Sequence, residues 1–238
     1  MARVEAIVLH TFRYGESSHI VQLLSREHGL LSCMVKGTRR RSPLSPVLMQ
    51  PFSLVEAVMD VRPNRQFQFL RESAPLALYD GISNDPVKHA MAFFLCETLC
   101  RALRESPADV RLFDFVADSV AVLNRVERGV ANFHLVFLIK MTYFLGFFPN
   151  LSDFHAGVLF DMENSSFVDV QTNVHTLDVA QTEVFAQLMR MDYANMYLFA
   201  LSGAQRSDIL DKILTYYRLH LPDFGEVKSF EVLRQLFA

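Results

Sequence analysis

The sequence contains no tryptophan and only three cysteines among its 238 residues, Cys33, Cys96 and Cys100. An odd number of cysteines without a Cys-x-x-Cys pair is not the framework of a small disulfide-rich protein. The first residues also lack the long apolar segment of a signal peptide. We therefore expect a cytoplasmic protein in a reducing compartment, whose thiols are buried and structural.

Long uninterrupted apolar segments are missing too. The most apolar segment, residues 130–148, carries His134, Lys140 and Gly146 and has no flanking cationic anchors. It is therefore expected to be a buried helix and not a membrane span. Apolar residues make up 51% of the sequence, which argues against disorder and is enough for the core of one large or two small domains.

The motifs of common enzyme classes are absent. The sequence has no glycine-rich phosphate loop followed by Lys-Ser or Lys-Thr, no G-x-S-x-G elbow and no H-E-x-x-H pair. Cys96 and Cys100 could share one helix face as metal ligands, with His89 as a third, but Cys33 is remote and buried thiols are the simpler interpretation. We expect neither an enzyme nor a cofactor.

The net charge of −3 hides an asymmetry along the chain. Residues 1–80 carry 10 basic and 7 acidic side chains, whereas residues 81–238 carry 13 and 19. The first part is net positive and the remainder is net negative, so the average does not exclude a nucleic-acid partner for the first part.

The stretch at residues 14–52 is the most informative. Apolar runs at 20–24 and 30–35, joined at 27–29, predict a β-hairpin. The second run leads into a basic loop that contains Lys36, Gly37, Arg39, Arg40 and Arg41. Such a loop suits a polyanion, because each phosphate that a cation neutralises releases condensed counterions. It could equally be a solvated loop without a partner.

Five segments before residue 73 have strand-like patterns: 7–14, 18–25, 30–36, 52–61 and 66–72. This number and their hairpin-rich order match an oligonucleotide-binding (OB) fold barrel. Phe67 and Phe69 share one face of the last strand, where they either fill the barrel or stack on bases. Tyr14, beside a glycine turn, is the better candidate for an exposed ring.

From residue 80 the pattern becomes helical. Asp85 and Pro86 are a typical N-cap and first helical residue. Helices are expected at 87–105, 108–127, 130–147, 179–191, 194–200, 207–221 and 229–237. An irregular segment at about 150–175 interrupts them and contains a small hairpin. The predicted fold class is α+β, with an OB-fold domain at 1–79 and a mainly α-helical domain at 80–238.

Four short motifs resemble the amino-terminal signature of the RecO recombination mediator family. They are YGESS at 14–18, REHGLL at 26–31, VKG at 35–37 followed by arginines, and QPF at 50–52. Weaker similarity continues at 145–151 and 216–221. The resemblance independently implies an OB fold.

The resemblance also implies a function. It indicates a non-enzymatic DNA-binding protein that binds single- and double-stranded DNA and anneals complementary strands. With RecR, such a protein helps to load RecA on single strands coated with single-stranded DNA-binding protein (SSB), in DNA repair by the RecF pathway. It would work in the cytoplasm, associated with the nucleoid.

The chain departs from its family in one respect. Many RecO proteins carry a four-cysteine zinc site after the Leu-Gly-x-x-Pro segment, but residues 150–175 here contain no cysteine. We therefore expect a variant without zinc, whose irregular segment is held by apolar packing of Leu151, Phe154, Phe160 and Phe167.

The candidate DNA contacts are the loop cations Lys36, Arg39, Arg40 and Arg41, which would position DNA through its phosphates without reading sequence. Tyr14 and five further arginines are additional candidates: Arg13, Arg26, Arg62, Arg65 and Arg71. In this family the helical domain is expected to receive the acidic, phenylalanine-ended tail of SSB. The cations available for its carboxylate are Arg101, Arg104, Arg125, Arg128 and Lys140, each of which could instead pair with Glu97, Glu105 or Glu127.

Two other functions remain open. The chain could be a helical adaptor that binds protein partners and uses the barrel as a scaffold, or an RNA-binding OB-fold protein. The second alternative shares the basic loop but not the motifs at residues 14–52.

Overall fold

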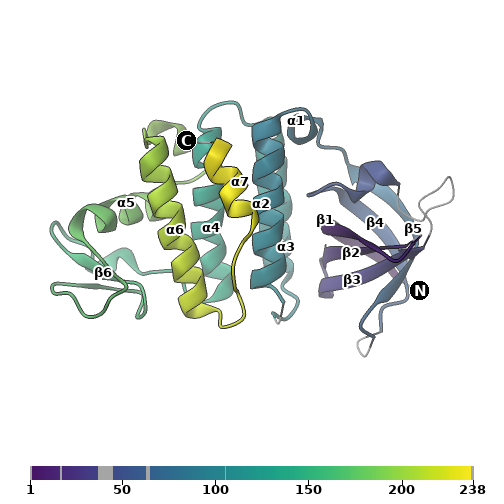
Figure 1. Cartoon of the computed structure of the whole chain (residues 1–238), viewed down its shortest axis with the longest axis horizontal. Coiled ribbons are helices and arrows are strands. Elements are labelled where there is room, and N and C mark those ends of the chain that lie inside the picture. Colours follow the sequence, from purple (N-terminus) through teal and green to yellow (C-terminus); the bar gives the residue numbers. More distant parts are fainter. Residues whose placement is uncertain (1, 17, 37–44, 63–64, 105, 237–238) are drawn as a thin grey trace. The chain divides into compact units, whose positions relative to one another are not determined.

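The computed structural model of the chain describes residues 2–16, 18–36, 45–62, 65–104 and 106–236 (Figure 1). The chain divides into two compact units, Met1–Arg125 with Val227–Leu233 and Val126–Glu226 with Arg234–Ala238. The first unit contains the barrel together with the first helices, so the division into units does not coincide with the domain boundary predicted after residue 79. That boundary stays a prediction.

The first unit begins with a closed five-stranded barrel in the order β1-β2-β3-β5-β4. Its neighbours pair antiparallel except β3 and β5, which meet in parallel at Cys33 with Gln68 and Met34 with Phe69. This strand number and closure confirm the predicted OB fold. The strands are β1 (Ala2–Tyr14), β2 (Ser18–Ser25), β3 (Gly29–Lys36), β4 (Leu54–Met59) and β5 (Gln68–Ala77).

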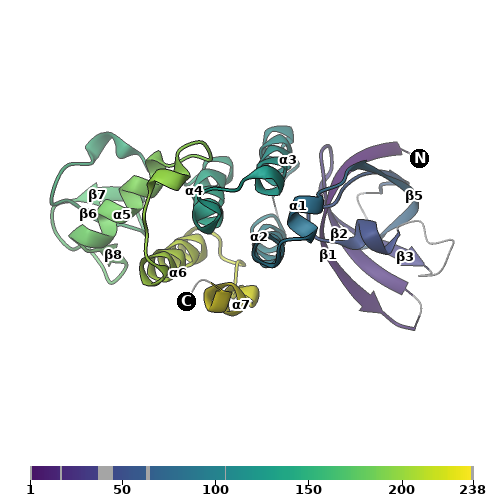
Figure 2. The same cartoon turned by 90° about the horizontal axis from the view of Figure 1, so that it is seen from above.

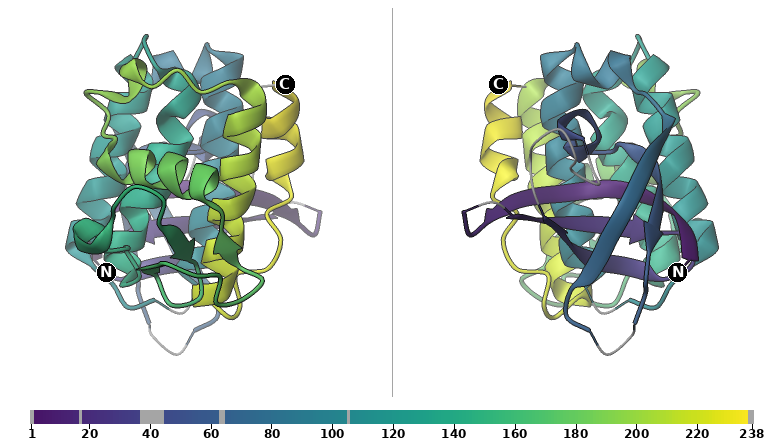
Figure 3. Two further views of the ribbon diagram at one scale, coloured as in Figure 1. Left: turned by 90° about the vertical axis from the view of Figure 1, so that its left-hand side faces the viewer. Right: turned by 90° about the vertical axis from the view of Figure 1, so that its right-hand side faces the viewer.

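The barrel closes around side chains that alternate along the strands. On β4 the inward residues Val55, Ala57 and Met59 are buried, and the residues between them are half-buried. In the middle of β1, Ala6–Leu9 are buried on both faces, because helix α2 also contacts this strand, and a bulge between Val8 and His10 then shifts its register. The right-hand view of Figure 3 shows β1 crossing the barrel.

Strand β5 extends further than predicted. It was expected at 66–72 but runs to Ala77 and includes Pro75. Proline lacks a backbone N–H and is tolerated at a strand edge or a bulge. Both conditions hold here, because the pairing with β3 ends at Phe69 and the register with β4 shifts between Leu54 and Val55.

Three helices follow in the first unit: α1 (Asp80–Ser83), α2 (Pro86–Ala102) and α3 (Val110–Arg125). The carboxylate of Asp85 accepts hydrogen bonds from the backbone N–H groups of Val87 and Lys88, which confirms the predicted N-cap. Gly29, at φ +67°, lies so close to Ala108 that an added Cβ would be 3.4 Å from the Ala108 Cα. Figure 2 shows α1 beside α2 and α3.

The second unit packs three helices and a small sheet. Helix α4 contacts both α5 and α6, and α5 contacts β6. The sheet has the order β7-β6-β8, and the β6–β7 pair confirms the hairpin predicted for the irregular segment. The bounds are α4 (Phe133–Leu145), β6 (Leu159–Asp161), β7 (Ser166–Val168), β8 (Thr176–Leu177), α5 (Val179–Arg190) and α6 (Gly203–His220). Helix α7 (Ser229–Leu236) ends the described chain.

Aromatic packing holds the small sheet on one side. The ring of Phe160 lies 5.1 Å from that of Phe167 and 4.9 Å from that of Phe185 on α5, and the Phe154 ring lies 5.5 Å from that of Phe167. The predicted packing of Phe154, Phe160 and Phe167 is therefore present. Leu151 lies in a short 3-10 helix before the sheet, Leu151–Asp153.

A buried carboxylate organises the other side of the sheet. Asp161 is 1% exposed and accepts hydrogen bonds from the hydroxyl of Thr172 at 2.6 Å and from the side-chain amides of Asn164 and Asn173 at 2.8 and 2.9 Å. Two backbone N–H groups also donate to it. Burial would raise the pKa of Asp161, but these hydrogen bonds outweigh burial and hold the pKa far below its usual range.

One predicted helix is wrong. Residues 194–200 were expected to be helical but form a single 3-10 turn, Met196–Leu198. The reason is a side chain from another element: the buried amide of Asn132 donates to the carbonyl oxygens of Met196 (3.0 Å) and Phe199 (2.9 Å). Those carbonyls are thereby satisfied without a helical turn.

The most apolar segment is a buried helix, as predicted. Helix α4 has 13 residues, nine of which are buried. Within the residues that the structure describes, no helix combines the length and apolar character needed to span a bilayer.

Candidate nucleic-acid interface

The basic loop leaves the barrel at the end of β3. Strand register places Lys36 opposite Ser18, and Ser18 opposite Tyr14 on β1. The side chain of Lys36 and the whole of Arg39, Arg40 and Arg41 lie outside the described residues. The structure thus gives the point of departure of the loop, at the end of the barrel where β1 ends and β2 begins.

Aromatic side chains gather at this same end. Tyr14 is 50% exposed, as expected, and its ring lies 6.2 Å from that of the half-buried Phe67. Phe69 is 36% exposed, and it pairs with Met34, two residues before Lys36. The barrel-filling interpretation is therefore wrong for Phe69, since the inward residues of β5 are its neighbours Gln68 and Leu70.

Two of the candidate arginines lie in the β4–β5 connection. Nε of Arg62 lies 2.9 Å from the carboxylate of Asp60, and Nη1 of Arg65 lies 4.0 Å from the same carboxylate. The guanidinium of Arg65 also lies 5.8 Å from the centre of the Phe69 ring. Cations and an exposed aromatic ring therefore occur together here.

A buried amide fastens this connection. Gln68 is 4% exposed, and its Nε2 donates to the carbonyl oxygens of Arg62 (2.9 Å) and Arg65 (3.2 Å). The backbone N–H of Arg62 donates back to Gln68 Oε1 at 2.9 Å. The backbone at both arginines is therefore fixed from inside the barrel.

The remaining candidate arginines of the barrel differ in how they are engaged. Arg13 is exposed, and its guanidinium donates to the carbonyl oxygen of Glu16 at 3.2 Å, while Arg71 is exposed on β5. Arg26 is half-buried between the carboxylates of Glu5 (3.2 Å) and Asp114 (2.9 Å). Arg26 thus joins the barrel to α3, and a DNA-contact role rests better on the others.

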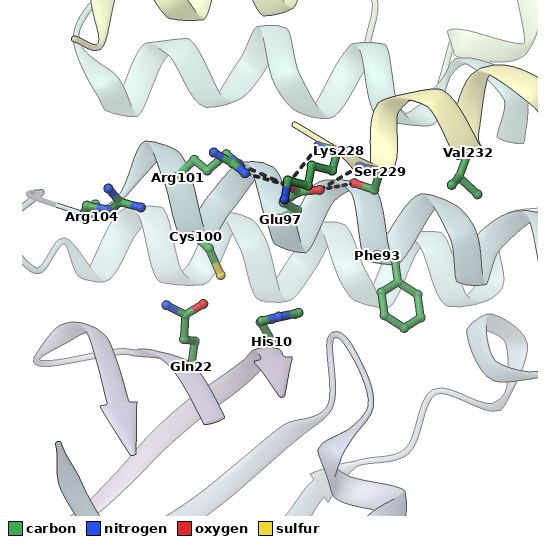
Figure 4. Close-up of a pocket in the computed structure, with 10 residues that line it drawn as sticks. All are labelled: His10, Gln22, Phe93, Glu97, Cys100, Arg101, Arg104, Lys228, Ser229 and Val232. Atoms are coloured by element: carbon green, nitrogen blue, oxygen red, sulfur yellow. Dashed lines mark hydrogen bonds and ion pairs between the residues drawn. The ribbon is translucent and has the colours of Figure 1, made fainter. Parts of the chain in front are cut away.

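A pocket of about 520 Å³ opens among β1, β2, α2 and the start of α7, all within the first unit (Figure 4). Its lining combines cationic side chains with the exposed apolar side chains of Phe93 and Val232. Figure 4 shows His10 and Gln22 on the barrel side, with Arg101 on α2 and Arg104 just after its end. The lining residues are His10, Gln22, Phe93, Glu97, Cys100, Arg101, Arg104, Lys228, Ser229 and Val232.

Glu97 holds one cation and the start of α7. Its carboxylate accepts from Arg101 (2.9 Å), from the backbone N–H groups of Lys228 (3.0 Å) and Ser229 (2.8 Å), and from the Ser229 hydroxyl (2.6 Å). Burial would raise the pKa of Glu97, but these hydrogen bonds outweigh it and lower the pKa. Arg101 is therefore paired with Glu97, which was one of the two alternatives expected for it. Arg104 and Lys228 are exposed.

The five cations proposed for a protein partner belong to two compact units. Arg101 and Arg104 line the pocket, and Arg125 is exposed at the end of α3. Arg128 and Lys140 belong to the other compact unit, where the guanidinium of Arg128 lies 4.3 Å from the centre of the Tyr197 ring.

The pocket contains residues that the sequence did not single out. Phe93 lies four and eight positions before the candidates Glu97 and Arg101, so its place on their face of α2 could have been recognised from the helical spacing. No local signal connects Lys228 and Val232 to that face, because they lie more than 120 positions further along the chain.

The thiols are packed and not arranged as ligands. Cys33 lies in the barrel core, and Cys96 is buried with its sulfur 4.0 Å from the carbonyl oxygen of Val8. Burial raises the pKa of both Cys33 and Cys100 to about 12. The ring of His89 packs on Phe93. Within the described part of the chain, no three His, Cys, Asp or Glu side chains are grouped as a metal site.

Comparison with known proteins identifies the family. The protein-family model described as Recombination protein O N terminal matches residues 1–79, and the family model described as Recombination protein O C terminal matches residues 83–229. The DNA repair protein RecO of Bacteroides fragilis is 39% identical over 240 residues, 100% of this chain and 99% of that protein. The DNA repair protein RecO of Phocaeicola vulgatus is 39% identical, over 100% of this chain and 100% of that protein. The one of Porphyromonas gingivalis is 34% identical, over 98% of this chain and 97% of that protein. These matches confirm the resemblance found in the sequence motifs, and the chain belongs to the RecO family.

Proposed function

We propose that this protein is a recombination mediator in DNA repair that binds single- and double-stranded DNA and anneals complementary strands without catalysing a reaction. Membership of the RecO family supports the general role in repair and recombination. With RecR it would help to load RecA on SSB-coated strands, working in the cytoplasm at the nucleoid.

One observation carries the DNA-binding part of this proposal. Tyr14 lies on an OB-fold barrel at the end from which the basic loop departs, and on the same barrel the exposed ring of Phe69 lies 5.8 Å from the guanidinium of Arg65. Exposed rings on such a barrel stack on unpaired bases, and neighbouring cations follow the phosphate backbone. Neither kind of contact reads base edges, which suits a protein that must accept any sequence.

The test is DNA binding as a function of salt. Replacing Lys36, Arg39, Arg40 and Arg41 together by alanine should weaken single-strand binding and reduce the salt slope by roughly 3, at about 0.7 per phosphate contact. Replacing Arg111 and Arg125, exposed cations of α3 in the same unit, is the control and should change the slope little. An unchanged slope in the fourfold variant would place the DNA site elsewhere.

The pocket supports the partner prediction. An acidic, phenylalanine-ended tail of SSB needs an apolar surface for its ring and a cation for its terminal carboxylate. Phe93 and Val232 offer the first, and the exposed Arg104 and Lys228 offer the second. A fluorescent tail peptide should bind the full-length protein at low salt and lose affinity without its last phenylalanine.

Charge reversal tests the location of this peptide site. The variant Arg104→Glu/Lys228→Glu should abolish peptide binding, whereas Arg125→Glu at the end of α3 should retain it. Equal binding by the truncated peptide, or by the doubly reversed variant, would contradict the assignment of the pocket.

Two alternatives predict different binding results. An RNA-binding OB-fold protein would prefer RNA to DNA of the same sequence at every salt concentration. A helical adaptor with a scaffold barrel would bind neither. Comparing single-stranded DNA, duplex DNA and RNA in one titration series distinguishes all three functions.

A further inference from the structure

The β4–β5 connection carries an anion between its two cations. Asp60, directly after β4, lies 2.9 Å from Nε of Arg62 and 4.0 Å from Nη1 of Arg65. A carboxylate paired with a guanidinium makes the same charge-assisted hydrogen bonds as a backbone phosphate. Asp60 therefore occupies a position that a nucleic-acid phosphate would take.

This arrangement is exchangeable. The side chains of Asp60 and Arg62 are 39% and 59% exposed, so water and salt weaken their attraction. Arg26 shows the contrasting case, since two carboxylates hold it in a half-buried place. A phosphate that approaches Arg62 and Arg65 displaces one weak partner and need not open a buried ion pair.

The backbone beneath the arginines is held in advance. Gln68 is a polar side chain in the barrel interior, where burying an amide is unfavourable unless its hydrogen bonds are made. Its three hydrogen bonds all go to the backbone of Arg62 and Arg65. An apolar residue at this position would fill the barrel interior equally well but would make none of these hydrogen bonds. The amide of Gln68 therefore acts by holding the backbone of Arg62 and Arg65 in place.

A base-stacking surface adjoins the arginines. Phe69 follows Gln68 on β5, turns outward, and lies 5.8 Å from the Arg65 guanidinium. Stacking of a base on an exposed ring places the adjacent phosphate within reach of a neighbouring cation. Such a pair of contacts suits a single strand, whose bases are unpaired and accessible.

We propose that Arg62, Arg65 and Phe69 form a contact site for one or two nucleotides of single-stranded DNA, that Gln68 is its positioning residue, and that Asp60 is a resident anion which the phosphate replaces. This site rests on the proposed DNA-binding function and adds to it a residue that lowers affinity. Because a phosphate must displace Asp60, the net gain from this contact is smaller and single-strand binding is more readily reversible.

The primary test removes the resident anion. Asp60→Asn should tighten single-strand binding at low salt by about threefold to fivefold, and should steepen the salt slope by about 0.7 for one further neutralised phosphate. Glu56→Gln is the control, because Glu56, within β4, is an exposed-face carboxylate that pairs with the exposed Arg3 at 3.3 Å and not with Arg62 or Arg65. It removes the same charge and should leave the slope unchanged.

The second test removes the positioning hydrogen bonds. Gln68→Met keeps the volume of the side chain and deletes its three hydrogen bonds. It should weaken single-strand binding and abolish the gain from Asp60→Asn when the two are combined, with the barrel checked by circular dichroism. If Gln68→Met does not fold, the variant Phe69→Leu is tested instead. Phe69→Leu should weaken single-strand binding by about tenfold, because the ring stacks on unpaired bases, and should leave duplex binding nearly unchanged.

The outcomes separate this proposal from the proposed function. If the unaltered protein binds no DNA, the proposed function fails. If it binds DNA but Asp60→Asn and Glu56→Gln have equal effects, or Asp60→Asn has none, the resident-anion proposal alone is overturned.

Discussion

The barrel and the small β6–β8 sheet are both β structures, but different forces hold them. Five strands of six to 13 residues close the barrel by backbone pairing around an apolar core. The strands of the small sheet have only two or three residues, too few for backbone pairing to stabilise them. Aromatic rings and the hydrogen bonds of Asp161 supply what the backbone cannot.

The difference explains where polar side chains are free to act. In the barrel, charged residues lie mostly outside the core, so loop arginines are available to a ligand. In the small sheet, the polar residues around Asp161 are committed to one another and hold its turns. We therefore expect changes at Asp161 to affect stability, and changes at the barrel loops to affect binding.

The largest effect is expected from Asp161→Ala. The change leaves several buried donors without their charged acceptor, and should lower the free energy of unfolding by about 3 kcal/mol. Urea unfolding, with amide hydrogen exchange at residues 159–177, measures it. Asp169→Asn is the control, because that carboxylate is exposed and pairs only weakly with His155 at 3.2 Å. If Asp161→Ala and Asp169→Asn lowered the free energy of unfolding equally, the hydrogen bonds of Asp161 would not be what stabilises the sheet.

A pH dependence of the same residue is the next effect in size. The pKa of Asp161 is lower in the folded protein than the value of about 3.9 in the unfolded chain. Its stabilising contribution is therefore complete above about pH 4 and is lost as the pH falls further towards the folded pKa. The stability difference between the wild type and Asp161→Asn should be constant from pH 7 to 5 and shrink below pH 4. A difference that grew at low pH would contradict this sign.

The smallest expected effect is that of a chelator. Since the sheet is held by side-chain contacts and residues 150–175 contain no cysteine, ethylenediaminetetraacetate should leave the melting temperature unchanged. Elemental analysis should find no stoichiometric zinc. One zinc per chain would redirect attention to His89, Cys96 and Cys100.

The sequence predicted the barrel well, because its strands carry local signals. Alternation marks β4, and glycines mark the turns before β2 and β3, so most strand bounds agree within a few residues. The turn at Met196–Leu198 was mispredicted because its cause, the amide of Asn132, lies more than 60 positions away. Likewise Gln68 resembled an ordinary polar strand residue, and its role at Arg62 and Arg65 appears only in three dimensions.

The pocket marks the limit of prediction from sequence in a different way. Its cations Arg101 and Arg104 were candidates, but they were grouped with Arg128 and Lys140, which belong to another compact unit. Charge and proximity along the chain do not show which side chains share a surface. That depends on packing, here on the carboxylate of Glu97 and its hydrogen bonds to Lys228 and Ser229.

The burial of the thiols has a consequence for a protein of DNA repair. Peroxides and other oxidants that damage DNA attack cysteine as the thiolate and not as the neutral thiol. Burial raises the pKa of Cys33 and Cys100 to about 12 and raises that of Cys96 as well, so the fold disfavours the reactive thiolate at all three positions. The fold should therefore keep its cysteines reduced while the cell is under oxidative stress, which is when the repair of DNA is most needed.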